Sequence, residues 1–102
     1  LGVTSLQRAP AAPDIPTVAE TVPGFESLSW HGLFAPAGFP AEIVARLNQE
    51  AVAALRMPAV ADRFRDLGIS PVGSSPEDFR SFVASETQRW GEVARRARIQ
   101  LD

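Results

Sequence analysis

The residues best suited to side-chain chemistry are His31, the only histidine of the chain, and the serines at positions 29 and 5. A histidine beside a serine can act as the general base that activates a nucleophile. Neither serine lies in the GxSxG motif that forms a nucleophile elbow, and no metal-binding pattern such as HExxH surrounds His31. The sequence therefore predicts no enzyme and no metal site. A small hydrolase using Ser29 or Ser5 with His31 stays as an alternative.

The charged residues favour solvated surfaces over a reactive or nucleic-acid-binding site. Asp62, Asp66, Glu77 and Asp78 lie among arginines on the expected helices, where paired charges are common on exposed faces. The formal net charge is −2, which provides no basic field to attract nucleic acid. No apolar run approaches the ~20 residues that cross a bilayer. We expect no cofactor, no nucleic-acid partner and no direct membrane insertion.

The first 40 residues carry the signals of two strands and a helical turn. Residues 1–5 are short and apolar, which suits a buried strand. Thr17, followed three positions later by Glu20, forms a capping-box pattern and predicts a single helical turn. Residues 28–36 alternate with apolar side chains on both sides, which predicts a strand covered on both faces.

The remaining residues carry the patterns of three helices. Apolar residues recur at three- and four-residue spacing over 40–56, and Pro58 can begin a second helix that Gly68 ends. Ser75 and Pro76 are a strong start for a long helix. The aromatic residues Phe79, Phe82 and Trp90 of this helix and Phe64 of the second helix are expected to pack in a core. Short strands are expected at 69–72 and 99–101. The sequence therefore predicts an α/β chain.

Three stretches together resemble the Bug/TctC family of extracytoplasmic solute-binding proteins. The first comprises Val3 to Ser5 (VTS), Arg8 and the run from Pro13 to Glu20 (PDIPTVAE). The second begins at Pro23-Gly24-Phe25 and continues through the run from Trp30 to Gly38 (WHGLFAPAG). The third is looser and includes the run from Ser75 to Phe79 (SPEDF). The order and spacing of these runs agree with the family nearly from end to end.

The resemblance implies a particular fold and function. It implies a periplasmic-binding-protein-like fold of type II, the Venus-flytrap arrangement of two α/β lobes that close on a ligand. This chain would be the C-terminal part of such a protein. Residues 1–27 would end the second lobe, 28–40 would form a crossover strand and its connection, and 41–102 would be a helical part that packs on the first lobe.

The family's role implies the partners. Its members capture small organic carboxylates in the periplasm for the membrane permease of a tripartite tricarboxylate transporter, and N-terminal loops hold the ligand carboxylate through backbone amides and waters. In open α/β sheets, ligands bind beyond the carboxyl ends of strands, so Thr4 and Ser5 are the first ligand-binding candidates. Trp30 and His31 on the expected crossover strand are the second. The alternative is a small stand-alone interaction domain that uses its arginine-rich end and has no transport role.

Overall fold

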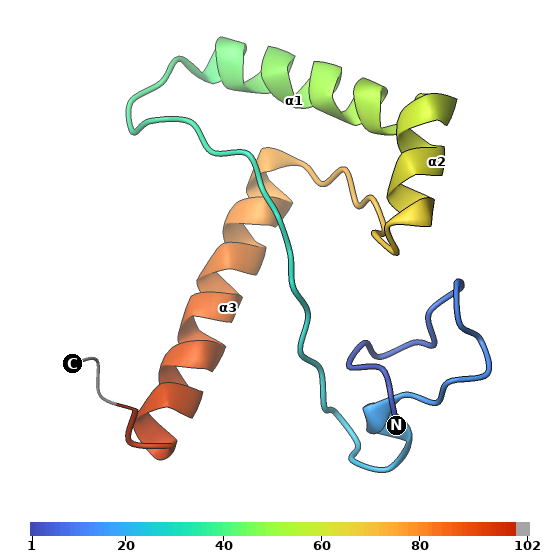
Figure 1. The fold of residues 1–102 in the computed structure, drawn as a ribbon. Helices are drawn as coiled ribbons and strands as arrows, with labels where there is room; N and C mark the ends of the chain where they lie inside the picture. The colour runs from blue at the N-terminus through green and yellow to red at the C-terminus, as the bar shows by residue number, and fades with distance from the viewer. Residues whose placement is uncertain (100–102) are drawn as a thin grey trace. The chain divides into compact units, whose positions relative to one another are not determined.

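A computed structural model describes residues 1–99, which form one short 3₁₀ helix and three α-helices (Figure 1). The elements are η1 (Val18–Glu20), α1 (Ala41–Leu55), α2 (Pro58–Asp66) and α3 (Pro76–Arg96). The chain divides into two compact units. Unit 1 comprises 1–37 and 57–71, and unit 2 comprises 38–56 and the residues from 72 onward.

The beginning of unit 1 is organised around η1. Thr17 caps this helix, since its side chain accepts a hydrogen bond from the Glu20 N–H at 3.2 Å while the Glu20 carboxylate accepts from the Thr17 N–H at 3.1 Å. This reciprocal pair is the predicted capping box. Val3 forms an isolated parallel bridge with Thr17, so the start of the chain runs beside the entry to η1.

Helix α2, also in unit 1, confirms the predicted boundaries of the second helix. Pro58 occupies its first position, where the missing N–H costs no hydrogen bond. Gly68 follows its end with φ of 69°, and the N–H of Ile69 donates to the Phe64 carbonyl at 2.8 Å. This is the left-handed glycine ending that the sequence predicts.

Unit 2 consists mainly of α1 and α3, which contact each other. Ser75 caps α3 by accepting from the Asp78 N–H at 3.1 Å, and Pro76 is the first helical residue, both as predicted. Before this cap, the Asn48 side chain of α1 donates to the Ser74 carbonyl at 2.9 Å. Gly73 has φ of 64°, and a β-carbon there would meet the Val52 methyl groups of α1 at 3.6 Å. Residues 73–75 therefore connect α1 to the beginning of α3.

The predicted strands are not formed within residues 1–99, so the α/β class is not confirmed for this chain. Residues 1–5 contribute only the bridge at Val3, and residues 28–36 and 69–72 have no regular secondary structure. An alternating pattern specifies which faces of a strand are covered, but a strand also needs neighbouring strands to satisfy its N–H and C=O groups. The strand predicted at 99–101 lies largely outside the described residues.

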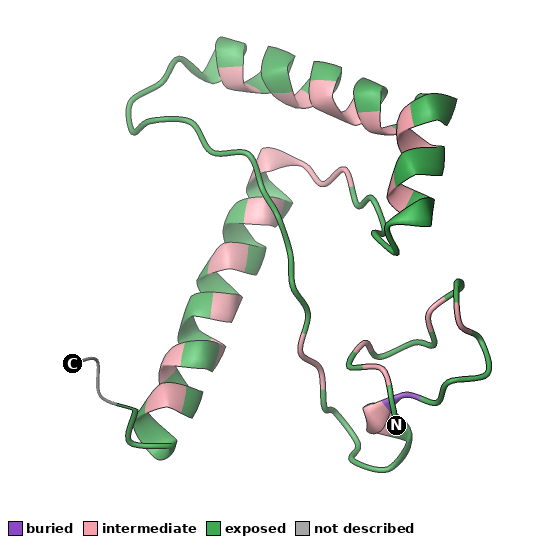
Figure 2. Cartoon of the chain, in the orientation of Figure 1, coloured by how far each residue is buried: buried purple, intermediate pink, exposed green. Residues whose placement is uncertain are grey.

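Apolar side chains on the helices are less buried than their spacing predicts. Thr17 is 4% exposed, and no apolar residue among the described ones is fully buried. Trp90 is 43% exposed, so the prediction that it packs in a core is wrong for this structure. Phe82 is exposed too, whereas Phe64 and Phe79 are half-buried. Half-buried residues recur along α1 and α3 (Figure 2), which is the pattern of amphipathic helices with limited cover.

None of the three described α-helices is both long and apolar enough to cross a bilayer.

Candidate functional site

The ligand-binding candidates Thr4 and Ser5 directly follow the bridge between Val3 and Thr17. The Val3 N–H donates to the Pro16 carbonyl, and the Val18 N–H donates to the Val3 carbonyl, both at 2.9 Å. The Thr4 carbonyl accepts from the Ser27 N–H at 2.9 Å, and Thr4 is exposed. The backbone at these two residues is therefore fixed on one side by η1 and on the other by Ser27.

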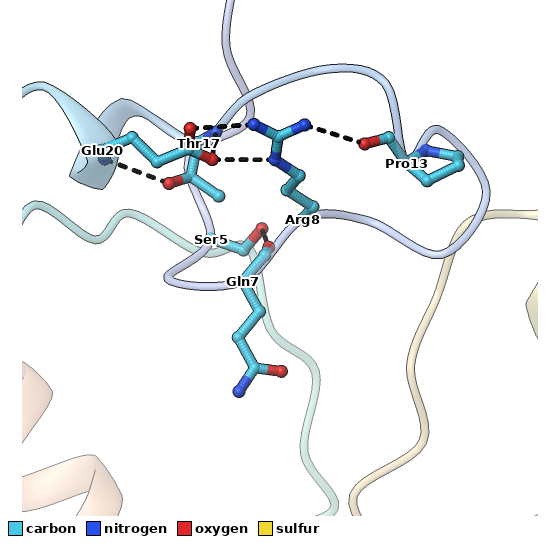
Figure 3. A network of polar contacts seen from close by, with 6 residues as sticks. All are labelled: Ser5, Gln7, Arg8, Pro13, Thr17 and Glu20. Atoms are coloured by element: carbon cyan, nitrogen blue, oxygen red, sulfur yellow. Dashed lines mark hydrogen bonds and ion pairs between the residues drawn. The ribbon is translucent and has the colours of Figure 1, made fainter.

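The Ser5 hydroxyl already has a local partner. It donates its hydrogen to the Gln7 carbonyl at 2.7 Å (Figure 3). A hydroxyl has one hydrogen and two lone pairs, so Ser5 in this conformation can accept from a ligand or water but has no second hydrogen to donate. The Thr4 hydroxyl is therefore the better donor candidate of the two.

Arg8 and Glu20 form a two-point ion pair beside these residues (Figure 3). Arg8 Nε donates to Glu20 Oε1 at 2.8 Å, and an Arg8 terminal nitrogen donates to Glu20 Oε2 at 2.9 Å. The other terminal nitrogen donates to the Pro13 carbonyl at 3.2 Å. Such parallel hydrogen bonds fix the orientation of both side chains as well as their separation. The pair closes the loop between residues 8 and 20.

The electrostatics of Glu20 follow from these contacts. The hydrogen bond from Arg8, followed by that from the Thr17 N–H, lowers the pKa of Glu20 from 4.5 to about 2. The same interaction raises the pKa of Arg8 above its usual value. Both residues therefore stay charged at neutral pH, and the network carries no net charge.

Trp30 and His31 lie in the extended stretch after Ser27. Trp30 is 38% exposed, and His31 is exposed. The Trp30 Cα lies within about 11 Å of the Ser27 Cα, since three residues of chain can span no more than that. The hydrogen bond between Ser27 and Thr4 thus brings the beginning of this stretch to the first candidate pair. A shared role of all four residues stays a prediction.

Sequence reasoning missed the Arg8–Glu20 pair, although it used both residues. In the sequence, Arg8 belongs to the family-like motif and Glu20 to the capping box, and neither pattern indicates that the two side chains pair. A stiff loop with prolines at positions 10, 13 and 16 separates a cation from the carboxylate of a helical turn, and this combination is the signal for a closing ion pair.

Within residues 1–99, no three or more His, Cys, Asp or Glu side chains come together in a way that could hold a metal ion.

Comparison with known proteins gives consistent matches. The family described as the tripartite tricarboxylate transporter family receptor, TctC, matches residues 1–99. A UPF0065 protein in the tcbD-tcbE intergenic region of Pseudomonas sp. strain P51 is 46% identical over 91% of this chain and 28% of its own length. Protein BugT of Bordetella pertussis is 35% identical over 99% of this chain and 31% of its own length.

A solved structure supports the same relationship. The periplasmic binding protein BugD superposes on 97% of this chain with a TM-score of 0.82 and 34% sequence identity. The matched region is 34% of the BugD chain, so the present chain spans about a third of that protein. Because the family match extends over nearly all of the sequence, the chain belongs to the TctC family of tripartite tricarboxylate transporter receptors, which are solute-binding proteins and not enzymes.

Proposed function

We propose that residues 1–102 are the C-terminal part of a two-lobed periplasmic protein that captures a small organic carboxylate for the permease of a tripartite tricarboxylate transporter. The two-lobed protein is the full-length protein, about as long as its relatives, that would contain residues 1–102. The observation that carries the proposal is the family match over residues 1–99, together with the likeness to the periplasmic binding protein BugD.

The exposure of the helices in unit 2 supports the proposed packing of residues 41–102 on a first lobe. Leu47 of α1 is exposed, as are Trp90 and Val93 of α3. Side chains of this size contribute about 1.5 to 3 kcal/mol each when they are fully removed from water. A first lobe lying over these faces would supply that burial.

The extended stretch at 28–36 supports the proposed crossover. Its Leu33 is 83% exposed, and Phe34 is also exposed. Apolar side chains on both sides of an extended segment suit a strand that is added to a sheet and covered on both faces. Two lobes joined by such crossing segments can close around a ligand by a hinge motion.

The chemistry around Thr4 and Ser5 suits a carboxylate ligand. The neighbouring Arg8 and Glu20 neutralise each other, so recognition at Thr4 and Ser5 would rest on neutral hydroxyl and backbone donors and not on the charge of Arg8. A neutral site lets a transport protein bind an anion and release it again. Ligand-binding proteins need no nucleophile or metal for this task.

Calorimetry on the two-lobed protein tests the proposal. Citrate, aspartate, glutamate and nicotinate are the probes, and we expect one of them to bind with a micromolar or lower dissociation constant. Tight binding of an uncharged sugar combined with no binding of any carboxylate probe would reject the proposed ligand class.

A further inference from the structure

The residues from Thr4 to Gln7 form a short loop, called the 4–7 loop, whose two ends are attached to the same element. At its start, Val3 hydrogen-bonds with the Pro16 carbonyl and the Val18 N–H. At its end, Arg8 holds both carboxylate oxygens of Glu20, the last residue of η1. Residues 16–20 therefore anchor the loop on both sides.

Glu20 connects the two anchors directly. Its Oε1 atom accepts from Arg8 Nε and also from the N–H of Thr17, the residue that bridges to Val3. One carboxylate group thus joins the end of the 4–7 loop to the backbone beside its beginning (Figure 3). Thr17, at the centre of this arrangement, is the most buried of the polar residues described.

Apolar packing does not fix the conformation of the loop. Leu6, its one large apolar residue, is 53% exposed. The remaining contacts are polar: Ser5 donates to the Gln7 carbonyl, and the Thr4 carbonyl accepts from Ser27. The conformation of a loop held by polar contacts depends strongly on the attachment of its ends. A detached end gains conformational entropy, which favours disordered conformations of the loop.

An exposed ion pair usually contributes little to global stability. The Arg8–Glu20 pair differs in geometry from the exposed i,i+3 and i,i+4 pairs within the helices of residues 1–99. Arg46 and Glu50 join successive turns of α1 through a single contact at 2.9 Å, whereas Arg8 and Glu20 join residues 12 positions apart through two parallel contacts. We therefore expect the Arg8–Glu20 pair to affect the local order of the loop more than the free energy of global unfolding.

We propose that Arg8 and Glu20 are positioning residues that hold the 4–7 loop, and with it Thr4 and Ser5, in the conformation that receives the carboxylate ligand. This proposal rests on the proposed function for its ligand. The ordering of the loop itself is independent of that function and can be measured without a ligand.

The test compares Glu20→Gln with wild type in the two-lobed protein. Glutamine still accepts from the Thr17 N–H and preserves the capping box, but it removes the charge that Arg8 pairs with. Glu50→Gln is the matched control, because it removes the charge from an exposed Arg–Glu pair within α1. Arg8→Lys is the second variant, since lysine keeps the charge but lacks the two-point geometry.

Two measurements are made on each variant. Backbone ¹⁵N order parameters of residues 5–7 should fall to below about 0.6 in Glu20→Gln and stay unchanged in Glu50→Gln. Calorimetry with the best of the four carboxylate probes should show a roughly tenfold higher dissociation constant if the competent loop conformation falls to a tenth of its population. Arg8→Lys should show both effects to a smaller extent.

Each outcome separates the two proposals. Unchanged order parameters in Glu20→Gln and Arg8→Lys overturn the positioning role, whatever the ligand does. A local loss of order with unchanged affinity also overturns it, because the loop would then be irrelevant to binding. If wild type binds an uncharged sugar tightly and no carboxylate probe while the variants lose loop order, the proposed carboxylate function fails and the ordering of the loop by the ion pair still stands.

Discussion

The Asn48 side-chain amide donates to the Ser74 carbonyl at 2.9 Å, across 26 positions of the sequence. This contact joins the middle of α1 to the residue before the N-cap of α3. The carbonyl is partly buried and its partner is fixed on a helix, so the contact sets where α3 begins relative to α1.

Replacement of Asn48 by alanine should therefore destabilise unit 2. We expect a loss of about 1 kcal/mol in the free energy of unfolding, the typical net value of one hydrogen bond. Urea denaturation of the two-lobed protein measures the difference. Gln49→Ala, at an exposed position of the same helix, is the control and should change stability by less than about 0.5 kcal/mol. Equal losses of stability in the two variants would show that the hydrogen bond from Asn48 to Ser74 does not stabilise unit 2.

Gly73→Ala and Gly91→Ala should have opposite effects. Gly73 has φ of 64° and lies against Val52 of α1, so a side chain there should cost about 1 to 2 kcal/mol of stability. Gly91 lies within α3, where a β-carbon would meet only the end of the Arg95 side chain at 3.9 Å. Alanine at position 91 should stabilise the helix by about 0.8 to 1 kcal/mol. Thermal unfolding of both variants checks the signs, and a stabilising Gly73→Ala would contradict the conformational argument.

The pKa of Glu20 predicts a pH dependence of the Arg8–Glu20 pair. Its folded-state pKa is lowered to about 2 from 4.5, so the stabilising effect of the pair is fully present above the unfolded-state value. It is lost as the pH falls from 4.5 towards 2. An NMR titration of the Glu20 side-chain carboxyl carbon in the two-lobed protein should give a midpoint near 2. Arg8→Gln should move that midpoint up, and an unchanged midpoint in this variant would mean that Arg8 is not the cause.

Trp90 tests the proposed packing on a first lobe. Its indole N–H donates to Glu86 at 3.0 Å, and the Arg89 guanidinium lies 5.1 Å from its ring centroid, while 43% of the residue is exposed here. If the first lobe covers this face, Trp90→Ala should destabilise the two-lobed protein by about 3 to 5 kcal/mol. Denaturation of wild type and variant, with tryptophan emission as an additional readout, measures this difference in the free energy of unfolding. A loss below about 1 kcal/mol is typical of a surface site and would show that the first lobe does not cover Trp90.

Local signals in the sequence predicted the helical elements well. The capping box at Thr17 and Glu20, the Pro58 start and the Ser75-Pro76 start all appear as expected. Each depends on residues within one helical turn, so no distant contact is needed to establish it.

The predictions that failed depend on distant parts of a protein. The stretch at 28–36 becomes a strand only beside other strands, and Trp90 becomes buried only beneath another surface. For the candidate site, the sequence indicated Thr4 and Ser5 from the expected strand end. It did not indicate that the Ser5 hydrogen is used by Gln7 or that Arg8 pairs with Glu20. The first contact depends on the backbone conformation of residues 5–7, and the second depends on how residues 8–20 fold back; residue types alone specify neither.

The final prediction concerns ligand binding by residues 1–102 alone. A cleft between two lobes gains affinity by enclosing its ligand and burying about 70 to 90% of its surface. One wall alone leaves the carboxylate in water, which competes for every hydrogen bond. We therefore expect the 102-residue chain to show no binding stronger than millimolar for citrate, aspartate, glutamate or nicotinate.

The neutral donors near the candidate residues explain that expectation. A hydrogen bond from the Thr4 hydroxyl or from a His31 ring nitrogen contributes about 0.5 to 1.5 kcal/mol in net terms, and the Ser5 hydrogen is already donated to Gln7. Association costs about 4 kcal/mol or more in lost translational and rotational freedom, which these contacts hardly offset. Calorimetry on the 102-residue chain and on the two-lobed protein compares the two cases directly. Micromolar binding by the shorter chain would place the whole site within residues 1–102, and enclosure by a first lobe would then be unnecessary.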